Sequence, residues 1–100
     1  MQINFHAHEF KTDVKLLDYV EQKVGKLAHY FEQIIDADVY LSLEGKKHIV
    51  RDKTLTLKLH LPGNTIVTTE TCLSFEEACD VVVEHAKRQL TKYKEKLHQH

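Results

Sequence analysis

The sequence predicts an α+β fold in the order β-α-β-β-β-α, with a four-stranded sheet and two helices packed on one face. Four segments have the residue pattern of strands with a single buried face. Two longer segments repeat apolar residues at the spacing of one helical stripe. Because each helix buries one stripe and each strand one face, the most economical arrangement places both helices on the same side of the sheet.

Strands are expected at residues 3–7, 37–43, 55–61 and 65–72. In the first three, apolar residues alternate with polar ones, so that every second side chain points into the core. The fourth is rich in β-branched residues and follows the turn signal Pro62-Gly63-Asn64, which predicts a hairpin. Residues 44–52, EGKKHIVRD, are expected to form either a hairpin connection or a continuation of the second and third strands.

The first helix is expected to begin after an N-cap at Asp13, whose carboxylate can accept hydrogen bonds from free backbone N–H groups. Its apolar stripe comprises residues 16, 17, 20, 24, 27, 28, 31, 34 and 35. This spacing of three and four residues predicts a helix that packs one side on the sheet.

The second helix opens with Ser74-Phe75-Glu76-Glu77, a capping box in which Ser74 and Glu77 satisfy each other's free backbone N–H groups. Its apolar stripe comprises Phe75, Ala78, Cys79, Val82, Ala86, Leu90, Tyr93 and Leu97. Cys79 is therefore expected in the core, whereas Cys72, near the end of the fourth strand, is expected to be partly exposed.

Length and composition predict a single domain that spans residues 1–100. One hundred residues with 42 % hydrophobic content suffice for one core. Cys72 and Cys79 do not form a CxxC pair, and the opening segment MQINFHAHEF lacks the features of a signal peptide. No apolar run approaches the roughly 18 residues of a membrane span. We therefore expect a cytoplasmic protein with reduced thiols and no membrane partner.

Positive charge is concentrated at the end of the second helix. The formal net charge is -1, yet residues 87–96 contain five basic residues and one acid. The helix macrodipole favours bases near a helix C-terminus by roughly 0.3–1 kcal/mol each, but this effect fades beyond the last turn. Because these bases span almost three turns, a surface that binds an anionic polymer explains them better.

The first helix is polarised across its width. On a helical wheel, Lys15, Lys23 and Lys26 lie together along one flank of the apolar stripe. The acidic residues of the other flank are Asp18, Glu21 and Glu32. Charges that serve only solubility tend to be interspersed, so this separation favours a functional basic flank.

The residue pattern favours a binding protein over an enzyme. No glycine-rich phosphate loop is present, and neither cysteine has the flanking signature of a nucleophile paired with a base. No catalytic residue and no small-molecule substrate are therefore expected. His6 and His8 could share one strand face, with the cysteines and the terminal histidines as further candidates for a zinc site. Because their spacing matches no recognised ligand pattern, we expect surface histidines, with no metal and no other cofactor.

Three segments resemble those of a known family: KVGKLAHYFEQI, HLPGNTI and RQLTKYKEKLHQH. With them the chain resembles the ribosome hibernation promoting factors, also called ribosome-associated translation inhibitors or sigma-54 modulation proteins. The resemblance covers essentially the whole chain and is closest to the short form of the family. Its most specific part is the C-terminal block, with the core R-Q-L-x-K-x-K.

The resemblance implies a ribosome-binding domain that occupies the messenger and transfer RNA channel of the small ribosomal subunit, between head and body. It would block translation during stress or stationary phase. The positions that would contact rRNA are Lys23, Lys26, Arg88, Lys92, Lys94 and Lys96, to which Lys15 is added from its wheel position. The short form of the family also allows for a separate partner that pairs ribosomes.

The chain departs from the family pattern in places. The second helix opens with SFEEACD, where the family usually has D-x-Y-x-A-I-D, and Thr68 and Glu70 replace small residues of the fourth strand. Lys46, Lys47 and Arg51 belong to a stretch that is longer than in short relatives, and we expect them to remain solvated. The alternative function is a regulatory protein-interaction module that acts through its acidic face, as the sigma-54 name suggests.

Overall fold

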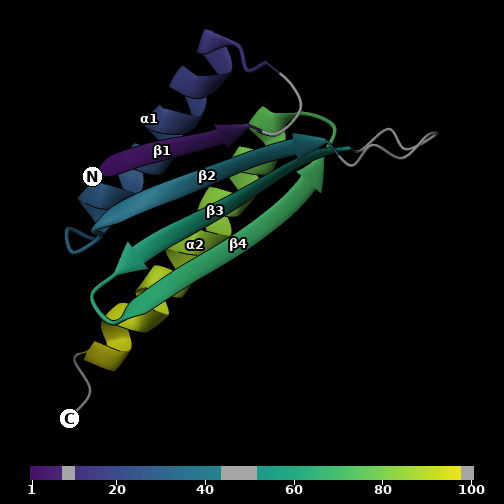
Figure 1. The fold of residues 1–100 in the computed structure, drawn as a ribbon. Helices are drawn as coiled ribbons and strands as arrows, with labels where there is room; N and C mark the ends of the chain where they lie inside the picture. Colours follow the sequence, from purple (N-terminus) through teal and green to yellow (C-terminus); the bar gives the residue numbers. More distant parts are fainter. Residues whose placement is uncertain (8–10, 44–51, 98–100) are drawn as a thin grey trace.

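The computed structural model describes residues 1–7, 11–43 and 52–97 of the chain (Figure 1). The elements follow the order β1 (Gln2–Ala7), α1 (Val14–Tyr30), β2 (Asp36–Leu43), β3 (Lys53–Leu61), β4 (Asn64–Cys72) and α2 (Phe75–Leu97). The predicted α+β class and the order β-α-β-β-β-α are therefore confirmed.

The four strands form one sheet in the order β1-β2-β3-β4, with β1 parallel to β2 and the other neighbours antiparallel. The parallel pair results from α1, because a chain that leaves one strand through a helix can re-enter the sheet in the same direction. The predicted turn joins β3 to β4. In this turn Gly63 has a φ of 74°, a conformation that glycine adopts at little cost.

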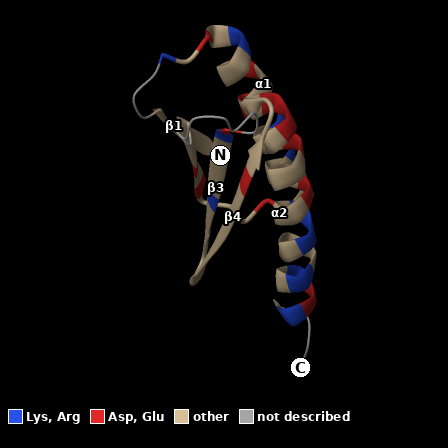
Figure 2. Cartoon of the chain, turned by 90° about the vertical axis from the view of Figure 1, so that its right-hand side faces the viewer, with Lys and Arg blue, Asp and Glu red and all other residues tan. Residues whose placement is uncertain are grey.

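Both helices cover the same face of the sheet, as predicted. In Figure 1 they lie behind the strands, and the quarter turn in Figure 2 places both on one side of the sheet. α2 packs on β3 and β4, while α1 packs on α2 and β1. None of the described helices is long and apolar enough to cross a membrane.

The core fills the space between the sheet and the helices. Leu55, Leu57 and Leu59 of β3 are fully buried and alternate with polar residues, as predicted. The helices contribute the buried side chains of Val20, Val24, Leu27, Ala78, Cys79, Val82, Ala86 and Leu90. Burial of each large aliphatic side chain is worth about 1.5–3 kcal/mol, so this layer supplies much of the driving force for folding.

Both helices begin at the predicted caps. The Asp13 carboxylate accepts hydrogen bonds from the backbone N–H groups of Lys15 (2.6 Å) and Leu16 (3.3 Å). The Ser74 hydroxyl accepts one from the backbone N–H of Glu77 at 3.1 Å. These bonds satisfy donors that a helix leaves without partners in its first turn.

The first helix is shorter than its apolar stripe suggested. α1 ends at Tyr30, and its C-cap residue Phe31 is extended, with φ -142° and ψ 103°. Ile34 is buried in the connection to β2, whereas Ile35 is 59 % exposed. The backbone N–H of Ile35 donates to the carbonyl of His60 at 2.7 Å, so the chain has already joined the sheet here.

Several burial expectations at the ends of elements were wrong. Leu43 at the end of β2 and Leu97 at the end of α2 are exposed, although both were predicted on buried faces. Ala7 is exposed at the end of the edge strand β1. Cys72 is buried, because it shares the helix-facing side of β4 with Ile66 and lies just before α2. Residues 44–51, with Lys46, Lys47 and Arg51, lie outside the described residues, as does His8.

Leu90→Ala should lower the free energy of unfolding by about 2–5 kcal/mol, because the lost side chain is fully buried and leaves a cavity. The midpoint of urea unfolding measures the effect. Leu97→Ala is the matched control on the same helix, where the side chain is 45 % exposed and the change should stay within about 0.5 kcal/mol. An unchanged midpoint for Leu90→Ala would contradict the packing of α2.

Candidate nucleic-acid interface

The basic residues of α2 are concentrated in its C-terminal half. Figure 2 shows acidic residues along the first half of the helix and mainly Lys and Arg along the second. Arg88, Lys92 and Lys96 are exposed, and Lys94 is half-buried. The two halves of this helix therefore present opposite charges.

α1 and α2 lie side by side and run in the same direction. The Tyr19 hydroxyl donates to Asp80 Oδ1 at 2.7 Å, and the hydroxyls of Tyr30 and Thr91 share a hydrogen bond. In both pairs the partners are 61 residues apart in sequence. A constant offset between contacting residues means that the helices are parallel and stay in one register.

This register places the basic flank of α1 beside the acidic half of α2. Lys23 Nζ lies 3.8 Å from Asp80 Oδ1 and 5.6 Å from the centre of the Tyr19 ring. By the same offset, Lys15 falls opposite Glu76. Lys23 therefore pairs with a carboxylate of its own chain, and the register sets Lys15 beside the acidic half of α2, which reduces the positive potential that both contribute.

Lys26 lies beyond this acidic segment. The offset of 61 residues sets it opposite Lys87, in the basic half of α2. The register thus sets Lys26 beside the basic half of α2, whereas its neighbour Lys23 pairs with Asp80 in the acidic half. The predicted separation of acidic and basic flanks is incomplete, because Lys26 also lines a hollow on α1 with Asp18 and Glu21.

Two lysine ammonium groups of α2 lie over the ring of Tyr30, which belongs to α1. Lys94 Nζ lies 4.7 Å from the ring centre and Lys87 Nζ 5.3 Å from it. Lys94 also donates to the Tyr30 carbonyl at 3.4 Å. Cation–π attraction can hold both ammonium groups without neutralising them. Lys87 was not among the predicted contact residues. The helical wheel already placed it on the same flank as Lys94, so the sequence could have indicated it.

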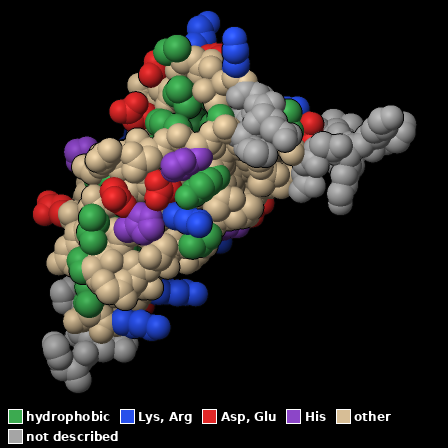
Figure 3. Space-filling model, in the orientation of Figure 1, with side chains coloured by type: hydrophobic (Ala, Val, Ile, Leu, Met, Phe, Trp, Pro, Cys, Tyr) green, Lys and Arg blue, Asp and Glu red, His purple; other side chains and the backbone are tan. Residues whose placement is uncertain are grey.

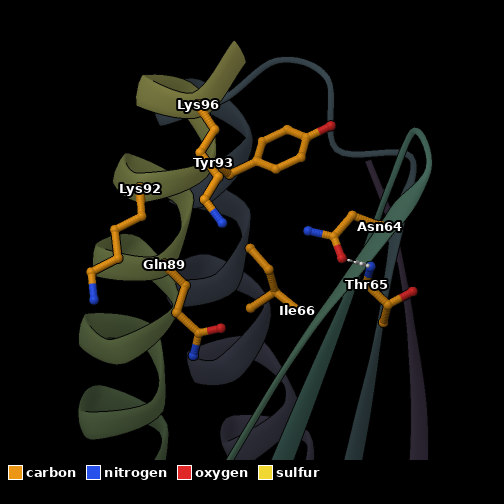
Figure 4. A pocket seen from close by; sticks show the side chains of 7 residues that line it. All are labelled: Asn64, Thr65, Ile66, Gln89, Lys92, Tyr93 and Lys96. Carbon is orange, nitrogen blue, oxygen red and sulfur yellow. Dashed lines mark hydrogen bonds between the residues drawn. The ribbon is translucent and has the colours of Figure 1, made fainter. Parts of the chain in front are cut away.

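A second group of bases lies where α2 passes the start of β4. Figure 4 shows the pocket of about 260 Å³ formed there, lined by Asn64, Thr65, Ile66, Gln89, Lys92, Tyr93 and Lys96. The Tyr93 hydroxyl donates to the Pro62 carbonyl at 3.0 Å, which ties the hairpin turn to the helix. Ammonium and amide groups line this pocket, with Lys92 directed away from β4 in Figure 4, and such groups bind phosphate oxygens in nucleic-acid complexes.

Cys79 is a core residue, as predicted. Burial raises the pKa of its thiol to about 12, and the neighbouring Asp80 adds to the increase. The thiol therefore remains protonated at neutral pH, whereas a nucleophilic cysteine needs a thiolate.

A group of potential metal ligands lies on the opposite face of the sheet. Asp36, Asp38 and His60 bring one ligand atom each within 4.8 Å of the others. Hydrogen bonds from His6 and then from His60 hold the pKa of Asp38 below its usual value. Sequence reasoning missed this group, because its members come from separate strands and have no characteristic spacing along the chain.

Residues 3–98 match the family described as Sigma 54 modulation protein / S30EA ribosomal protein. The chain belongs to this family. The family predicted from the sequence is therefore confirmed. A family relative from Salmonella typhimurium, named ribosome hibernation promoting factor, is 35 % identical over 100 residues that cover the whole of both chains.

Solved structures share the fold of this family member. The N-terminal domain of Protein Y from Thermus thermophilus superposes with a TM-score of 0.78 and 26 % identity, covering 93 % of this chain and 99 % of that one. A ribosomal subunit interface protein from Coxiella burnetii gives a TM-score of 0.82, covering 94 % of this chain and 98 % of that one. At 19 % identity, the second likeness shows the fold alone.

Tyr19 should lose its proton at about pH 12, because its hydrogen bond to Asp80 and, secondly, burial raise its pKa from 10.0 to about 12. Since the pKa is raised in the folded state, the associated stability is complete below about pH 10 and is lost as the pH rises towards 12. NMR of labelled tyrosine follows the titration. Asp80→Ala should return the pKa towards 10, and a wild-type pKa near 10 would contradict the bond between the helices.

Proposed function

We propose that this protein is a ribosome hibernation factor that binds the small ribosomal subunit and blocks translation during stress or stationary phase. Residues 1–100 act as one ribosome-binding domain in the cytoplasm, without catalysis. The observation that carries this function is a basic surface on the C-terminal half of α2 and the adjoining part of α1. We define the basic surface as Lys26, Lys87, Arg88, Lys92, Lys94 and Lys96.

The family relationship supports a ribosomal partner. The Salmonella typhimurium relative carries the name ribosome hibernation promoting factor and aligns with this chain from end to end. A relative from Escherichia coli has the same name and is 32 % identical over 100 residues. We extend the function in these names to this chain, because the alignments include the basic half of α2.

The basic surface suits a folded RNA. Among the described residues, the helix lysine that pairs with a carboxylate is Lys23, whose partner is Asp80, and Lys23 lies outside this surface. Phosphates are crowded in folded RNA, so lysines and an arginine on a rigid helix pair release counterions when they bind. No readout of base edges is needed, because the shape of the cleft decides where the protein rests.

Inhibition then follows from occupancy. In our proposal the domain lies between head and body of the small subunit, in the channel that messenger and transfer RNA otherwise use. A folded domain held there excludes both ligands by steric competition, and no chemical step is required. Lys15 and Lys23 belong to the same RNA-facing side, but we assign them a smaller share because they face acids of α2.

Binding to isolated small subunits should weaken steeply with salt. If the basic surface neutralises about five phosphates, log K should fall against log salt with a slope of roughly -3.5 to -4.5. Filter binding or cosedimentation at a series of potassium chloride concentrations measures this slope. A slope near zero would exclude the basic surface as the contact.

Charge reversal should locate the contact. Lys26→Glu and Lys92→Glu lie on different helices, both are exposed, and each should weaken cosedimentation with ribosomes and inhibition of cell-free translation. Folding should change by no more than about 0.5 kcal/mol, because both side chains are on the surface. Each reversal removes one favourable phosphate contact and adds a repulsive one.

Glu21→Lys is the matched control on the outer side of α1, where Glu21 is exposed. It should leave binding unchanged or strengthen it slightly through the general field. The opposite pattern, in which both lysine reversals retain full activity and Glu21→Lys abolishes it, would favour the regulatory module that acts through its acidic face.

A further inference from the structure

Several titratable side chains meet on the sheet face that carries neither α1 nor α2. Figure 3 shows histidine, acidic and basic side chains gathered over the strands on this face. Asp36 and Asp38 are two residues apart on β2, so both point to the same side of the sheet. The strand register places His60 of β3 directly opposite Asp36. On the other side, β1 brings His6 within reach of Asp38.

The distances within this group suit a metal ion. His60 Nε2 lies 2.9 Å from Asp38 Oδ2 and 3.8 Å from Asp36 Oδ1. Two ligands that each lie roughly 2.0–2.1 Å from one tetrahedral zinc ion are about 3.3 Å apart. The two separations from His60 bracket this value, and all three ligand atoms lie within 4.8 Å of one another. Rotation of the side chains, with loss of the hydrogen bond between His60 and Asp38, would bring the three ligand atoms around one ion.

Asp36 supplies an independent reason for a bound cation. The Asp36 side chain is 38 % exposed, but its Oδ1 atom is itself buried and has no hydrogen-bond partner among the described residues. A buried carboxylate oxygen without a donor is unfavourable. The imidazole of His60 forms its hydrogen bond with Asp38 and lies farther from Asp36 Oδ1. A cation between the three residues would give Asp36 Oδ1 the partner that it lacks.

We propose that Asp36, Asp38 and His60 bind a divalent transition metal ion of the zinc class, with water completing the coordination. Zinc accepts both imidazole and carboxylate ligands, and three protein ligands with water in the fourth position also occur in catalytic zinc sites. This face is then a metal site that is separate from the basic surface.

His6 acts as a positioning residue for this site. Its Nε2 lies 3.0 Å from Asp38 Oδ1, the oxygen that does not contact His60. Its ring stacks on Tyr40, with centroids 4.5 Å apart, which fixes its direction. Hydrogen bonds of this kind orient ligand carboxylates. Lys58 pairs with Asp38 across the strands, but its Nζ lies over the Tyr40 ring at 5.0 Å.

The ion joins strands that are otherwise connected by backbone pairing and packing. It links β2 to β3 directly and β1 to β2 through His6. Metal binding is independent of ribosome binding, because the ligands lie on the face opposite the helices that carry the basic surface. The expected effect of the metal is therefore on stability, with RNA affinity nearly unchanged.

The test uses the chain of residues 1–100 without a purification tag, after metal is removed with a chelator. Titration calorimetry with zinc chloride should show one equivalent bound, and thermal unfolding should shift to higher temperature, because the ion binds only the folded state. Cobalt(II) in place of zinc should give the strong visible absorption of a tetrahedral site. A wild-type chain that binds no stoichiometric zinc would overturn the site.

Variants identify the ligands. Asp36→Asn and His60→Gln should each lower zinc affinity at least tenfold and remove the thermal shift, while His6→Gln should lower affinity about 10- to 100-fold. Asp36→Asn retains the hydrogen bonds of Asp38, so it should fold, which circular dichroism confirms. His29→Gln, an exposed histidine of α1, is the control and should bind as the wild type does. Wild-type affinity in both ligand variants would refute the assignment.

Discussion

Every strand and helix of this protein has one apolar side, and the need to bury those sides together is the constraint on which the rest of the structure depends. The leucines of β3 alternate with polar residues, so only one face of the sheet can exclude water. Both helices must cover that face, and they therefore lie next to each other. The polar side chains of the strands are left together on the other face.

The adjacency of the helices decides which charges remain available to a partner. Tyr19 and Tyr30 connect α1 to α2 at a constant offset, and this register sets the acidic first half of α2 against Lys15 and Lys23 of α1. Opposite charges at short range lower each other's potential, whereas the bases beyond Asp80 and Glu84 meet other bases. The electrostatic character of the surface therefore changes along the helix pair rather than across it.

The two faces of the sheet consequently have different chemistry. On the helix side, the C-terminal half of α2 carries lysine ammonium groups around the Tyr30 ring and beside a polar pocket. This arrangement suits a polyanion whose phosphates are spread over a surface. The bare side has imidazole and carboxylate groups held by strand pairing, at separations that suit a single small cation. Rigid strands can fix ligand atoms more closely than long lysine side chains can.

The sequence by itself determined the elements and their caps, because these depend on interactions within a few residues. The alternation in β3, the turn at Gly63, the caps at Asp13 and Ser74 and the burial of Leu90 were all predictable. The same local signals misplaced the end of α1. Ile34 fits the spacing of the helical apolar stripe, yet it lies in the connection to β2 and is buried there. An apolar residue in the sequence indicates burial, but it does not show whether the backbone is helical or extended.

Only the tertiary structure decided how the predicted bases are grouped. A helical wheel places Lys23 and Lys26 on one flank, but it contains no information about the neighbouring helix. That helix sets Asp80 against Lys23 and Lys87 opposite Lys26. Likewise, Asp36 and His60 are far apart in the chain and meet only through the β2–β3 register. Charge pairing and ligand geometry depend on distances in space, and those arise once long-range packing has brought the segments together.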